Sequence, residues 1–368
     1  MPRRRIVLFG ATGFTGRLTA HAMVDRGLRP VVAGRARDRL ATLAAELGGL
    51  DIAVADASAP TTVDRLVEAG DVLVSTVGPF TRYGEAAVRA AVTAGATYLD
   101  STGEPGFIGR VFTEWGPQAA ESGAALLTAF GYDYVPGNLA VALALADAEP
   151  GAVRVDVGYF VTGQPTRSGF SSGTMASLVA MGSDPVLVYR GWRLQPDRMA
   201  RKVRTFAVDG RPRQALSVSA SEHFAVPPLA PTLREVNVYN GWFGQLTRVV
   251  QGAATAAALA GRLPGAGAVQ RLAGQAAPSQ TGRGPDVDER ARTRSEIVAV
   301  AYDTAGRQLA SVALAGPNPY DLTAGLLAWG AAQAADGAVS GTGALGPVEA
   351  FGVPGLLAGA ESAGLHRR

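Results

Sequence analysis

Short apolar runs alternate with helix-compatible stretches through the first 145 residues of the chain. The run 6–9 is apolar throughout, which is typical of a parallel strand buried on both faces. The same pattern predicts further strands at 30–35, 51–55, 71–77, 97–99 and 124–129. Helices are predicted between and after them, at 17–26, 37–47, 61–69, 84–94 and 117–122. This alternation predicts an α/β fold with a Rossmann-type, doubly wound parallel sheet.

The pattern changes near Pro150. Longer alternating or β-branched strands are predicted at 153–161, 203–208, 214–219 and 296–302, with hairpin turns at 209–210 and 303–306. The chain becomes helical again at 321–335. We therefore predict a nucleotide-binding domain at 1–145 and a substrate domain at 146–319. The second domain is expected to be α+β on a mostly antiparallel sheet, with a C-terminal tail at 320–368 that packs back on the first domain.

Three glycines spaced three apart follow the first strand: Gly10, Gly13 and Gly16. In a dinucleotide site one glycine makes the strand-to-helix turn, one lets the backbone approach the pyrophosphate, and one allows close helix–strand packing. The alternative is an ordinary glycine-rich turn, which the strand before it, the helix after it and the nearly N-terminal position disfavour. We predict that this loop contacts the cofactor through Gly10, Ala11, Thr12, Gly13, Phe14, Thr15 and Gly16.

The end of the second strand indicates which dinucleotide is bound. An NAD enzyme usually carries an acidic residue there, which accepts a hydrogen bond from the ribose 2′-hydroxyl. This chain has Arg35 after Gly34, and Arg39 follows. A guanidinium pairs with a 2′-phosphate, so we predict NADP(H) with Gly34, Arg35 and Arg39 as contacts. The alternative is a solvated arginine face on the following helix, which we expect for Arg37.

Composition excludes several function classes. The formal net charge is only +3 and the basic residues are scattered, so nucleic-acid binding has no support. The chain has no cysteine and three widely spaced histidines, which excludes disulfides and gives no metal site. No uncharged apolar stretch reaches the length of about 18 residues that a membrane span needs. We expect a cytoplasmic protein.

Further candidates follow the other strands of the first domain. Asp56 ends the third strand, where it could bind the adenine or cap the next helix, and capping is slightly favoured. The loop after the fourth strand falls where the nicotinamide ribose lies in such folds, although proline and glycine are also ordinary turn residues. Asp100 and Gly103 follow the fifth strand and are also predicted cofactor contacts. Those after the fourth strand are Val77, Gly78, Pro79, Phe80 and Tyr83.

Five motifs of the first 140 residues occur in order and carry a family resemblance: 10–16, 33–35, 76–80, 98–104 and 131–139. Together they resemble the saccharopine dehydrogenase-like NADP-binding oxidoreductases, closest to the branch of trans-acting enoyl reductases. Segments 171–177, 282–285 and 316–324 resemble the same branch. The resemblance implies NADP(H) as cofactor and reduction of a polarised double bond. It does not identify the substrate.

Asp133 lies between Tyr132 and Tyr134, just after the sixth strand. A buried carboxyl with a raised pKa could give a proton after hydride delivery, so these three residues are the catalytic candidates. The alternative is a hinge whose polar groups bond the backbone. The hydroxyls of Ser168, Ser171, Ser172 and Thr174 precede a helix-like run and could bind substrate or cap the helix. The lone His223 is expected to be structural.

The segment 242–282 is poor in charge. It could pack as a core helical pair, which is slightly favoured, close over an acyl chain as a lid, or rest on lipid. A homodimer is also open. The leading hypothesis is an NADPH-dependent reductase of a polarised C=C or C=N bond, with a small-molecule or acyl-type, polyketide-like enoyl substrate. The alternatives are an NADP-binding sensor or scaffold without turnover, and an amino-acid dehydrogenase of the saccharopine type.

Overall fold

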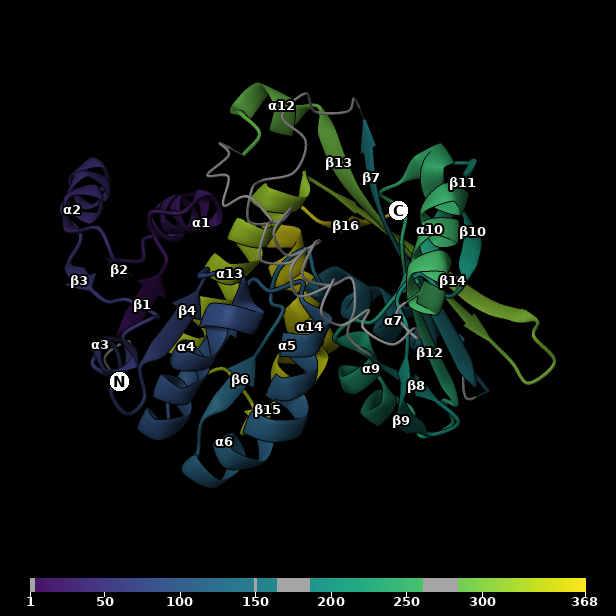
Figure 1. The fold of residues 1–368 in the computed structure, drawn as a ribbon, viewed down its shortest axis with the longest axis horizontal. Coiled ribbons are helices and arrows are strands. Elements are labelled where there is room, and N and C mark those ends of the chain that lie inside the picture. The colour runs from purple at the N-terminus through teal and green to yellow at the C-terminus, as the bar shows by residue number, and fades with distance from the viewer. Residues whose placement is uncertain (1–3, 149–150, 164–185, 261–283) are drawn as a thin grey trace.

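A computed structural model describes residues 4–148, 151–163, 186–260 and 284–368 of the chain. Two sheets lie side by side, with helices around the first and between the two (Figure 1). The first sheet has the order β15-β6-β5-β4-β1-β2-β3, and every neighbouring pair in it is parallel. Its strands are β1 (Ile6–Phe9), β2 (Val31–Gly34), β3 (Ile52–Val54), β4 (Val72–Ser75), β5 (Thr97–Asp100), β6 (Ala125–Leu127) and β15 (Gly343–Ala344).

This order confirms the predicted Rossmann sheet. The strand order reverses at β1, which pairs with β2 on one side and with β4 on the other. A crevice opens at such a switch point beyond the carboxyl ends of the strands, and dinucleotides bind there. The helices of this half are α1 (Phe14–Asp25), α2 (Arg37–Glu46), α3 (Pro60–Asp64), α4 (Phe80–Ala94), α5 (Pro105–Arg110), the π-helical turn η1 (Val111–Trp115) and α6 (Gly116–Ser122).

Helix α4 begins earlier than the sequence pattern predicts, at Phe80 and not at residue 84. The carboxylate of Glu104 accepts hydrogen bonds from the backbone N–H groups of Phe80 and Thr81, at 2.8 Å each. A distant residue therefore supplies the cap that the local sequence lacks, because Pro79 at the N-cap position has no side-chain acceptor. The start of the helix could not be read from the local sequence for this reason.

The second sheet has the order β10-β11-β12-β7-β13-β14-β16, and the β8–β9 hairpin joins it at β12. Within the described residues all its pairs are antiparallel except β12 with β7, so the predicted mostly antiparallel sheet is confirmed. Its strands are β7 (Arg154–Gly163), β8 (Val186–Arg190), β9 (Arg193–Asp197), β10 (Val203–Val208), β11 (Arg211–Val218), β12 (Glu235–Asn240), β13 (Thr293–Tyr302), β14 (Gln308–Gly316) and β16 (His366–Arg367).

The hairpin of β10 and β11 turns at Asp209-Gly210 as predicted. Both residues have positive φ, 51° and 72°, which is the geometry of a tight primed turn and favours a glycine at one position. The turn at 303–306 joins β13 and β14. In this sheet strands β8, β9, β12, β14 and β16 are additional to the sequence prediction. The pattern of β14 alternates, whereas β9 contains Pro196 and offers no clear strand signal.

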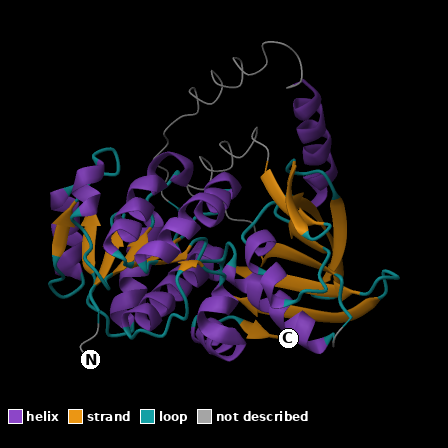
Figure 2. Ribbon diagram, turned by 90° about the horizontal axis from the view of Figure 1, so that it is seen from below, coloured by secondary structure: helices purple, strands orange, loops and turns teal. Residues whose placement is uncertain are grey.

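The C-terminal part of the chain connects the two sheets. Helix α13 (Pro319–Ala335) packs against α1, β4 and β5, whereas α14 (Pro347–Ser362) packs against α13 and α7 (Val135–Asp147). Helix α7 in turn lies on β13 and β14. Strand β15 extends the first sheet beside β6, and β16 pairs with β14 in the second. Figure 2 shows the same layers from below, with helices between the two groups of strands.

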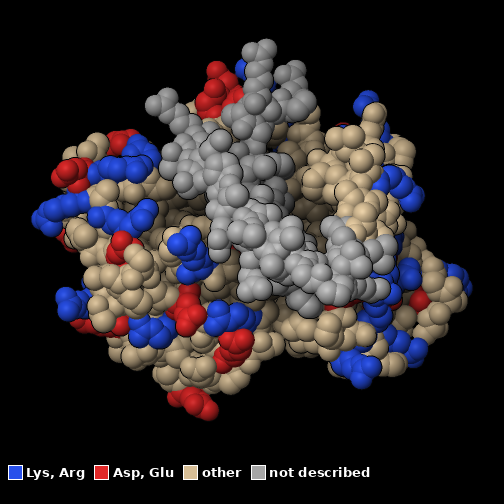
Figure 3. All heavy atoms as spheres, in the orientation of Figure 1, with Lys and Arg blue, Asp and Glu red and all other residues tan. Residues whose placement is uncertain are grey.

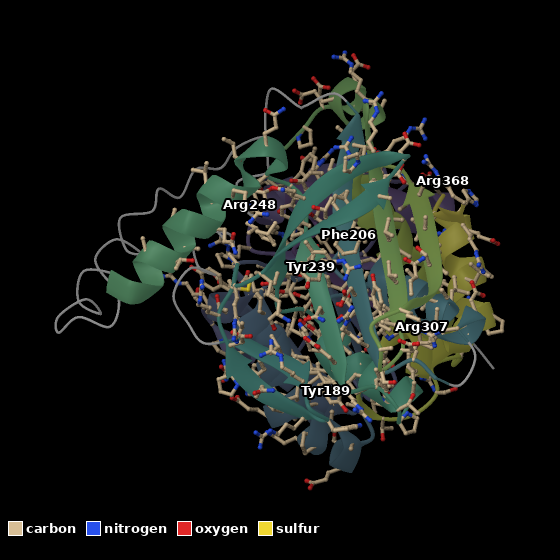
Figure 4. All side chains as sticks on the ribbon, turned by 90° about the vertical axis from the view of Figure 1, so that its right-hand side faces the viewer. Tyr189, Phe206, Tyr239, Arg248, Arg307 and Arg368 are labelled. Atoms are coloured by element: carbon tan, nitrogen blue, oxygen red, sulfur yellow. The ribbon has the colours of Figure 1, made fainter. Side chains whose placement is uncertain are left out.

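One apolar core runs through this arrangement. It includes Leu8 of β1, Val155 of β7, Ile297 of β13 and Leu326 of α13, none of which is more than 1% exposed. A smaller cluster lies on the face of the second sheet that is turned away from the first, where Figure 4 labels Phe206 and Tyr239. The remaining helical turns of this half are α9 (Glu222–Ala225), η2 (Pro227–Leu229), η3 (Gly244–Leu246), α10 (Thr247–Ala260) and α12 (Val287–Ala291).

Candidate active site

A cavity of about 1060 Å³ extends from the glycine loop to the second sheet. The carboxyl ends of β1, β2 and β4 supply one wall, and β11 with the segment after β12 supplies the other. Figure 3 shows the molecule from the side of Figure 1, with basic and acidic side chains interspersed on this face. The residues of the first half that line the cavity and were predicted as cofactor contacts are Gly10, Thr12, Gly13, Phe14, Thr15, Gly34, Arg35, Arg39, Asp56, Val77, Gly78, Phe80, Tyr83 and Gly103.

The glycine loop presents backbone to the cavity. Gly10 has φ of 90°, a conformation that other residues rarely adopt, and its carbonyl accepts a hydrogen bond of 2.9 Å from the N–H of Gly13. Gly13 is the N-cap of α1 and has no capping side chain, and the first turn of the helix carries no acidic residue. The free N–H groups and positive end of α1 therefore face the cavity without a negative neighbour in that turn, which suits an anion.

Ala11 and Gly16 belong to the same loop but do not line the cavity. The N–H of Ala11 donates to the carbonyl of Ala33, and its side chain is fully buried. A Cβ at Gly16 would lie 2.1 Å from the carbonyl oxygen of Gly10. Gly16 therefore allows close packing of helix and strand, and the direct cofactor contacts of Gly16 and Ala11 stay predictions.

Arg35 is exposed at the end of β2 and makes no hydrogen bond or ion pair within the described part of the chain. Arg37, the first residue of α2, does not line the cavity. Arg39 donates a 3.0 Å hydrogen bond to the carbonyl of Thr12, so it connects α2 to the glycine loop. Arg35 is thus the cation that remains available for an anionic ligand at the end of β2.

Asp56 faces the same end of the cavity from the end of β3. Its carboxylate accepts hydrogen bonds from the backbone N–H and the hydroxyl of Ser58, at 2.9 and 2.6 Å. These bonds, with a smaller contribution from Arg35, lower the pKa of Asp56. The side chain forms a local turn before α3, so it does not serve as the N-cap residue, which is Ala59.

Pro79 and Asp100 do not line the cavity, and their cofactor contacts stay predictions. Asp100 is fully buried, and its carboxylate accepts hydrogen bonds from the backbone of Thr102 and Ala129 and from the hydroxyl of Thr128. Burial raises its pKa to about 6 despite these bonds. The residue holds the ends of β5 and β6 together. Pro79 occupies the N-cap position of α4.

Asp133 is the carboxyl group that enters the cavity near its middle. It lines the cavity, and within the described residues no hydrogen bond reaches its side chain. Gly103 lies against it, because a Cβ at Gly103 would be 3.0 Å from Oδ2 of Asp133. Burial raises the pKa of Asp133 to about 7, so the group is protonated in a large share of molecules near neutral pH.

The two tyrosines beside Asp133 are placed differently. Tyr134 lines the cavity and packs edge-on against Tyr159, with ring centroids 5.4 Å apart. Tyr132 is buried and does not line the cavity, and its hydroxyl accepts a 3.4 Å hydrogen bond from the indole N–H of Trp242. Burial raises the pKa of both phenols well above their usual range. Asp133 and Tyr134 therefore line the cavity and Tyr132 does not, and the catalytic role of all three stays a prediction.

The part of the second-sheet wall formed by residues 199–250 carries no charged side chain, whereas Asp286 and Arg290, which precede β13, line the cavity elsewhere. Its polar members are Ser217 and Asn240, and the others are Met199, Ala200, Leu216, Val218, Trp242, Phe243 and Val250. The predicted substrate residues Ser168, Ser171, Ser172 and Thr174 lie outside the described residues. So does most of the segment 242–282, of which the structure describes 242–260.

The described part of that segment does not enter a core. Leu246 and Val249 are 63% and 66% exposed, and Phe243 and Val250 line the cavity. The core-packing alternative is therefore wrong for residues 243–256. The structure does not decide between a lid and a lipid-facing surface, and both stay predictions.

Sequence reasoning missed a segment that crosses the start of α1. Gly284 lies against the ring of Phe14, and the ring of Tyr320 packs edge-on against it with centroids 5.0 Å apart. Arg290 donates to Asp321 at 2.8 Å and to the carbonyl of Pro285 at 3.0 Å. The family-like segments near 282–285 and 316–324 thus meet at the glycine loop. Their distance in the sequence hid this meeting.

Residues 6–126 match the family model of the saccharopine dehydrogenase NADP-binding domain. The match covers β1 to β6, the strands and loops that build the first wall of the cavity. Residues 6–126 are a saccharopine dehydrogenase NADP-binding domain. The resemblance drawn from the sequence motifs and the assignment of NADP(H) as cofactor are confirmed.

Named relatives extend the comparison. A Mycobacterium tuberculosis protein, provisionally named a trans-acting enoyl reductase, is 41% identical over 181 residues, which make up 47% of this chain and 43% of that protein. A trans-acting enoyl reductase of Mycobacterium ulcerans is 42% identical over 142 residues, 37% of this chain and 34% of its own. The matched part is therefore less than half the length of these relatives.

The whole fold has a solved counterpart. Apo saccharopine dehydrogenase (L-Glu forming) from Saccharomyces cerevisiae superposes with a TM-score of 0.60 over 99% of both chains, at 13% sequence identity. At that identity the likeness concerns the fold alone. It shows that the NADP-binding domain and the second sheet are arranged here as in a saccharopine dehydrogenase.

The saccharopine dehydrogenase NADP-binding domain of this chain fits its cofactor. The pyrophosphate would meet the open N-terminus of α1 beside Gly13, where an added Cβ would lie 3.3 Å from the carbonyl oxygen of Gly10. Arg35 would pair with the 2′-phosphate, because no acidic side chain takes its place at the end of β2.

Other candidates from the sequence have structural roles or no counterpart. His223 is buried, its Nδ1 accepts the N–H of Tyr189, and its Nε2 lies 3.3 Å from the carbonyl of Val218. Burial lowers its pKa to about 4, so it is neutral and structural. Within the described part of the chain no group of His, Asp and Glu side chains could hold a metal ion. No described helix is long and apolar enough to cross a membrane.

Proposed function

We propose that this protein is an NADPH-dependent reductase that saturates the polarised C=C bond of an acyl thioester. One observation carries the proposal: a single cavity joins the phosphate-binding end of α1 to Asp133 and to an uncharged wall of the second sheet. Cofactor, proton source and apolar substrate space are therefore continuous. A continuous cavity of this kind suits hydride transfer followed by protonation.

The residues divide the work by position. Bound NADPH supplies a hydride to the β-carbon of the double bond. Asp133 holds the proton that the α-carbon then takes, so the products are a saturated thioester and NADP⁺. Burial keeps Asp133 partly protonated at neutral pH. Within the described residues no hydrogen-bond donor stabilises its ionised form. Tyr134 closes the cavity beside it and keeps the proton away from bulk solvent.

The uncharged wall favours an acyl substrate over a free amino acid. Saccharopine and related imines carry carboxylates, which need cations or several donors when they leave water. The described part of the wall formed by β11 and the residues after β12 offers the hydroxyl of Ser217 and the amide of Asn240 as polar groups. Apolar side chains such as Leu216 and Phe243 suit methylene groups. The names of the mycobacterial relatives point in the same direction.

A panel assay tests this proposal. Oxidation of NADPH is followed with a trans-2-decenoyl thioester of N-acetylcysteamine, with saccharopine and NADP⁺ in the reverse direction, and with NADPH alone. We expect turnover of the thioester only. Turnover of saccharopine in place of the thioester would support the amino-acid dehydrogenase. NADPH binding without turnover of either compound would support the sensor or scaffold.

A further inference from the structure

Side chains from two elements meet at the start of α7, directly behind Asp133 and Tyr134. Tyr159 comes from β7 and Glu222 from the first residue of α9, and both are buried. The hydroxyl oxygen of Tyr159 lies 2.5 Å from Oε1 of Glu222 and 2.9 Å from the backbone nitrogen of Gly137. It also lies 3.2 Å from the carbonyl oxygen of Tyr134.

The chain leaves space for this cluster at one position. A Cβ at Gly137 would lie 2.0 Å from the hydroxyl oxygen of Tyr159 and 2.3 Å from Oε1 of Glu222. Any residue larger than glycine at position 137 would push the two side chains away. The glycine therefore lets a phenol and a carboxyl group reach the backbone that carries Asp133.

The hydrogen-bond donors and acceptors around the hydroxyl of Tyr159 favour a protonated Glu222. A tyrosine hydroxyl has one hydrogen to donate and can accept two. The N–H of Gly137 can only donate to Tyr159, and the carbonyl of Tyr134 can only accept from it. If Glu222 were ionised, it too could only accept, and the single hydrogen of Tyr159 could serve only one of the two acceptors, which would leave the carbonyl of Tyr134 to the N–H and the Nδ2 of Asn138. A protonated Glu222 donates to Tyr159, which then donates to Tyr134, and all three contacts are satisfied.

We propose that Glu222 is a positioning residue that carries a proton and, through the hydroxyl of Tyr159, fixes the backbone of Tyr134 so that Asp133 faces the cavity. The part that concerns Asp133 rests on the proposed reductase function. Asn138 adds a second support, because its Nδ2 donates to the same carbonyl of Tyr134 at 2.9 Å and to the hydroxyl of Ser221 at 3.0 Å. Helix α9 thus holds the turn through Ser221 and Glu222 together.

The surroundings favour the neutral form of Glu222. Its Oε2 is buried and has no hydrogen-bond partner in the described structure, which would be costly for a carboxylate. The titratable groups that act on it are Asp133 and Tyr159, of which Asp133 disfavours its charge and the hydrogen bond of Tyr159 favours it. Burial is the largest cause and raises the pKa of Glu222 to about 8. The next residue, His223, is engaged elsewhere by Tyr189 and Val218.

Infrared spectroscopy tests the proton directly and needs no substrate. We expect the C=O stretching band of a neutral carboxylic acid at about pH 7.5, which disappears on titration to about pH 10. Asp133 and Asp100, with pKa values of about 7 and about 6, add bands of their own, so the contribution of Glu222 is the difference between Asp133→Asn and the double variant Asp133→Asn/Glu222→Gln. If these two variants show the same band at about pH 6, Glu222 is ionised and the proposal is wrong.

Kinetics with the decenoyl thioester test the positioning role. Glu222→Gln keeps a neutral donor for Tyr159, so it should retain at least about a third of the wild-type kcat. Glu222→Leu and Tyr159→Phe break the hydrogen-bond chain and should lower kcat by about tenfold to a hundredfold, with KM and NADPH affinity within about twofold. The matched control is Glu296→Gln. Glu296 is a buried glutamate of β13 that is ion-paired with Arg368 and does not line the cavity. This variant should leave kcat unchanged.

The outcomes separate this inference from the proposed function. If Glu222→Gln is as inactive as Glu222→Leu, or if Glu222→Leu is fully active, the positioning role is wrong while the reductase stands. If the wild-type protein does not reduce the thioester, the proposed function fails and the claim about Asp133 fails with it. The infrared result still decides whether Glu222 carries the proton.

Discussion

Arg35 and Asp133 show how two side chains acquire a function from their surroundings. Arg35 makes no hydrogen bond or ion pair in the described chain, whereas Arg39, four residues on, donates a hydrogen bond to the carbonyl of Thr12. Asp133 has no hydrogen bond, whereas Asp100, at the end of a neighbouring strand, has three. Asp133 lines the cavity and Asp100 does not, whereas Arg35 and Arg39 both line it and differ in that Arg39 is already bonded to the carbonyl of Thr12. An unengaged polar group at a cavity marks a ligand or reaction site.

Replacing Arg35 with alanine should weaken NADP⁺ binding by about tenfold or more and leave NAD⁺ binding nearly unchanged, because a charge-assisted contact to the 2′-phosphate is lost. Isothermal titration calorimetry with both cofactors measures this. Arg37→Ala is the control, since Arg37 is exposed and does not line the cavity. Equal losses for the two cofactors would contradict the 2′-phosphate assignment.

The pH dependence of turnover should report Asp133. A proton donor is active in its protonated form, so kcat should fall as the pH rises through about 7, the raised pKa of Asp133. Asp133→Asn should lower kcat by about a hundredfold, remove this fall and leave NADPH affinity unchanged. The control, Asp147→Asn, alters a surface carboxylate paired with Arg367. A variant that keeps the wild-type pH profile would exclude Asp133 as the donor.

Local residues predicted some of these features and not others. The glycine spacing, Arg35 and the acidic residue between two tyrosines are visible in the sequence, because each is a short-range signal. Glu222 is not, since its partner Tyr159 lies 63 positions away and only the fold joins them. For Asp100, its place at the end of a strand did not show whether its carboxylate points into the cavity or bonds to neighbouring groups, as it does to Thr102, Thr128 and Ala129.

At the scale of elements, β1 and α1 carry the cofactor site and were the most predictable part. A buried parallel strand, a glycine turn and a helix follow one another within 25 residues, so one local pattern specifies them. The second sheet was less predictable. Strand β12 pairs with β7 in parallel across about 80 positions, and the β8–β9 hairpin attaches to the same strand. Such pairings depend on distant neighbours, and no local turn signal reports them.

The glycine loop allows a sharp comparison between two positions. A Cβ at Gly13 would make one tight contact, 3.3 Å from the carbonyl oxygen of Gly10, whereas a Cβ at Gly16 would collide with that oxygen at 2.1 Å. We expect Gly13→Val to fold normally and to lose NADPH binding, because the branched side chain would occupy the approach of the pyrophosphate. Gly16→Val should lower the melting temperature as well. Circular dichroism and NADPH fluorescence titration measure both effects.

Unaltered NADPH binding in Gly13→Val would mean that the loop does not hold the phosphates. Loss of fold in Gly13→Val would mean that the carbonyl of Gly10 does not yield to a Cβ placed 3.3 Å from it. Wild-type stability in Gly16→Val would contradict the close packing of α1 on β1.

At the scale of the molecule, the cavity lies between two sheets that share one apolar core. The C-terminal helices α13 and α14 lie between them, and β15 and β16 add one strand to each (Figure 1). The sequence predicted that the tail returns to the first domain. It gave no sign that β16 pairs with β14 in the second sheet, because a two-residue strand has no pattern of its own.

The size and apolar wall of the cavity predict a dependence on acyl length. Each methylene that leaves water contributes about 0.8 kcal/mol, so kcat/KM should rise about threefold to fourfold per CH₂ until the cavity is filled. Steady-state kinetics with trans-2-enoyl thioesters of N-acetylcysteamine from four to twelve carbons measure this. A flat series would contradict the binding of the chain to the apolar wall.

Isotope labelling of the product is the most direct test of the reductase account. The protein is incubated with trans-2-decenoyl N-acetylcysteamine thioester and NADPH deuterated at the transferred position of C4, or with unlabelled NADPH in D₂O, and the product is analysed by mass spectrometry and NMR. We predict one deuterium at the β-carbon in the first case and one at the α-carbon in the second, with the solvent-derived incorporation slowed in Asp133→Asn. Absence of cofactor-derived deuterium from the product, with NADPH bound, would contradict the account.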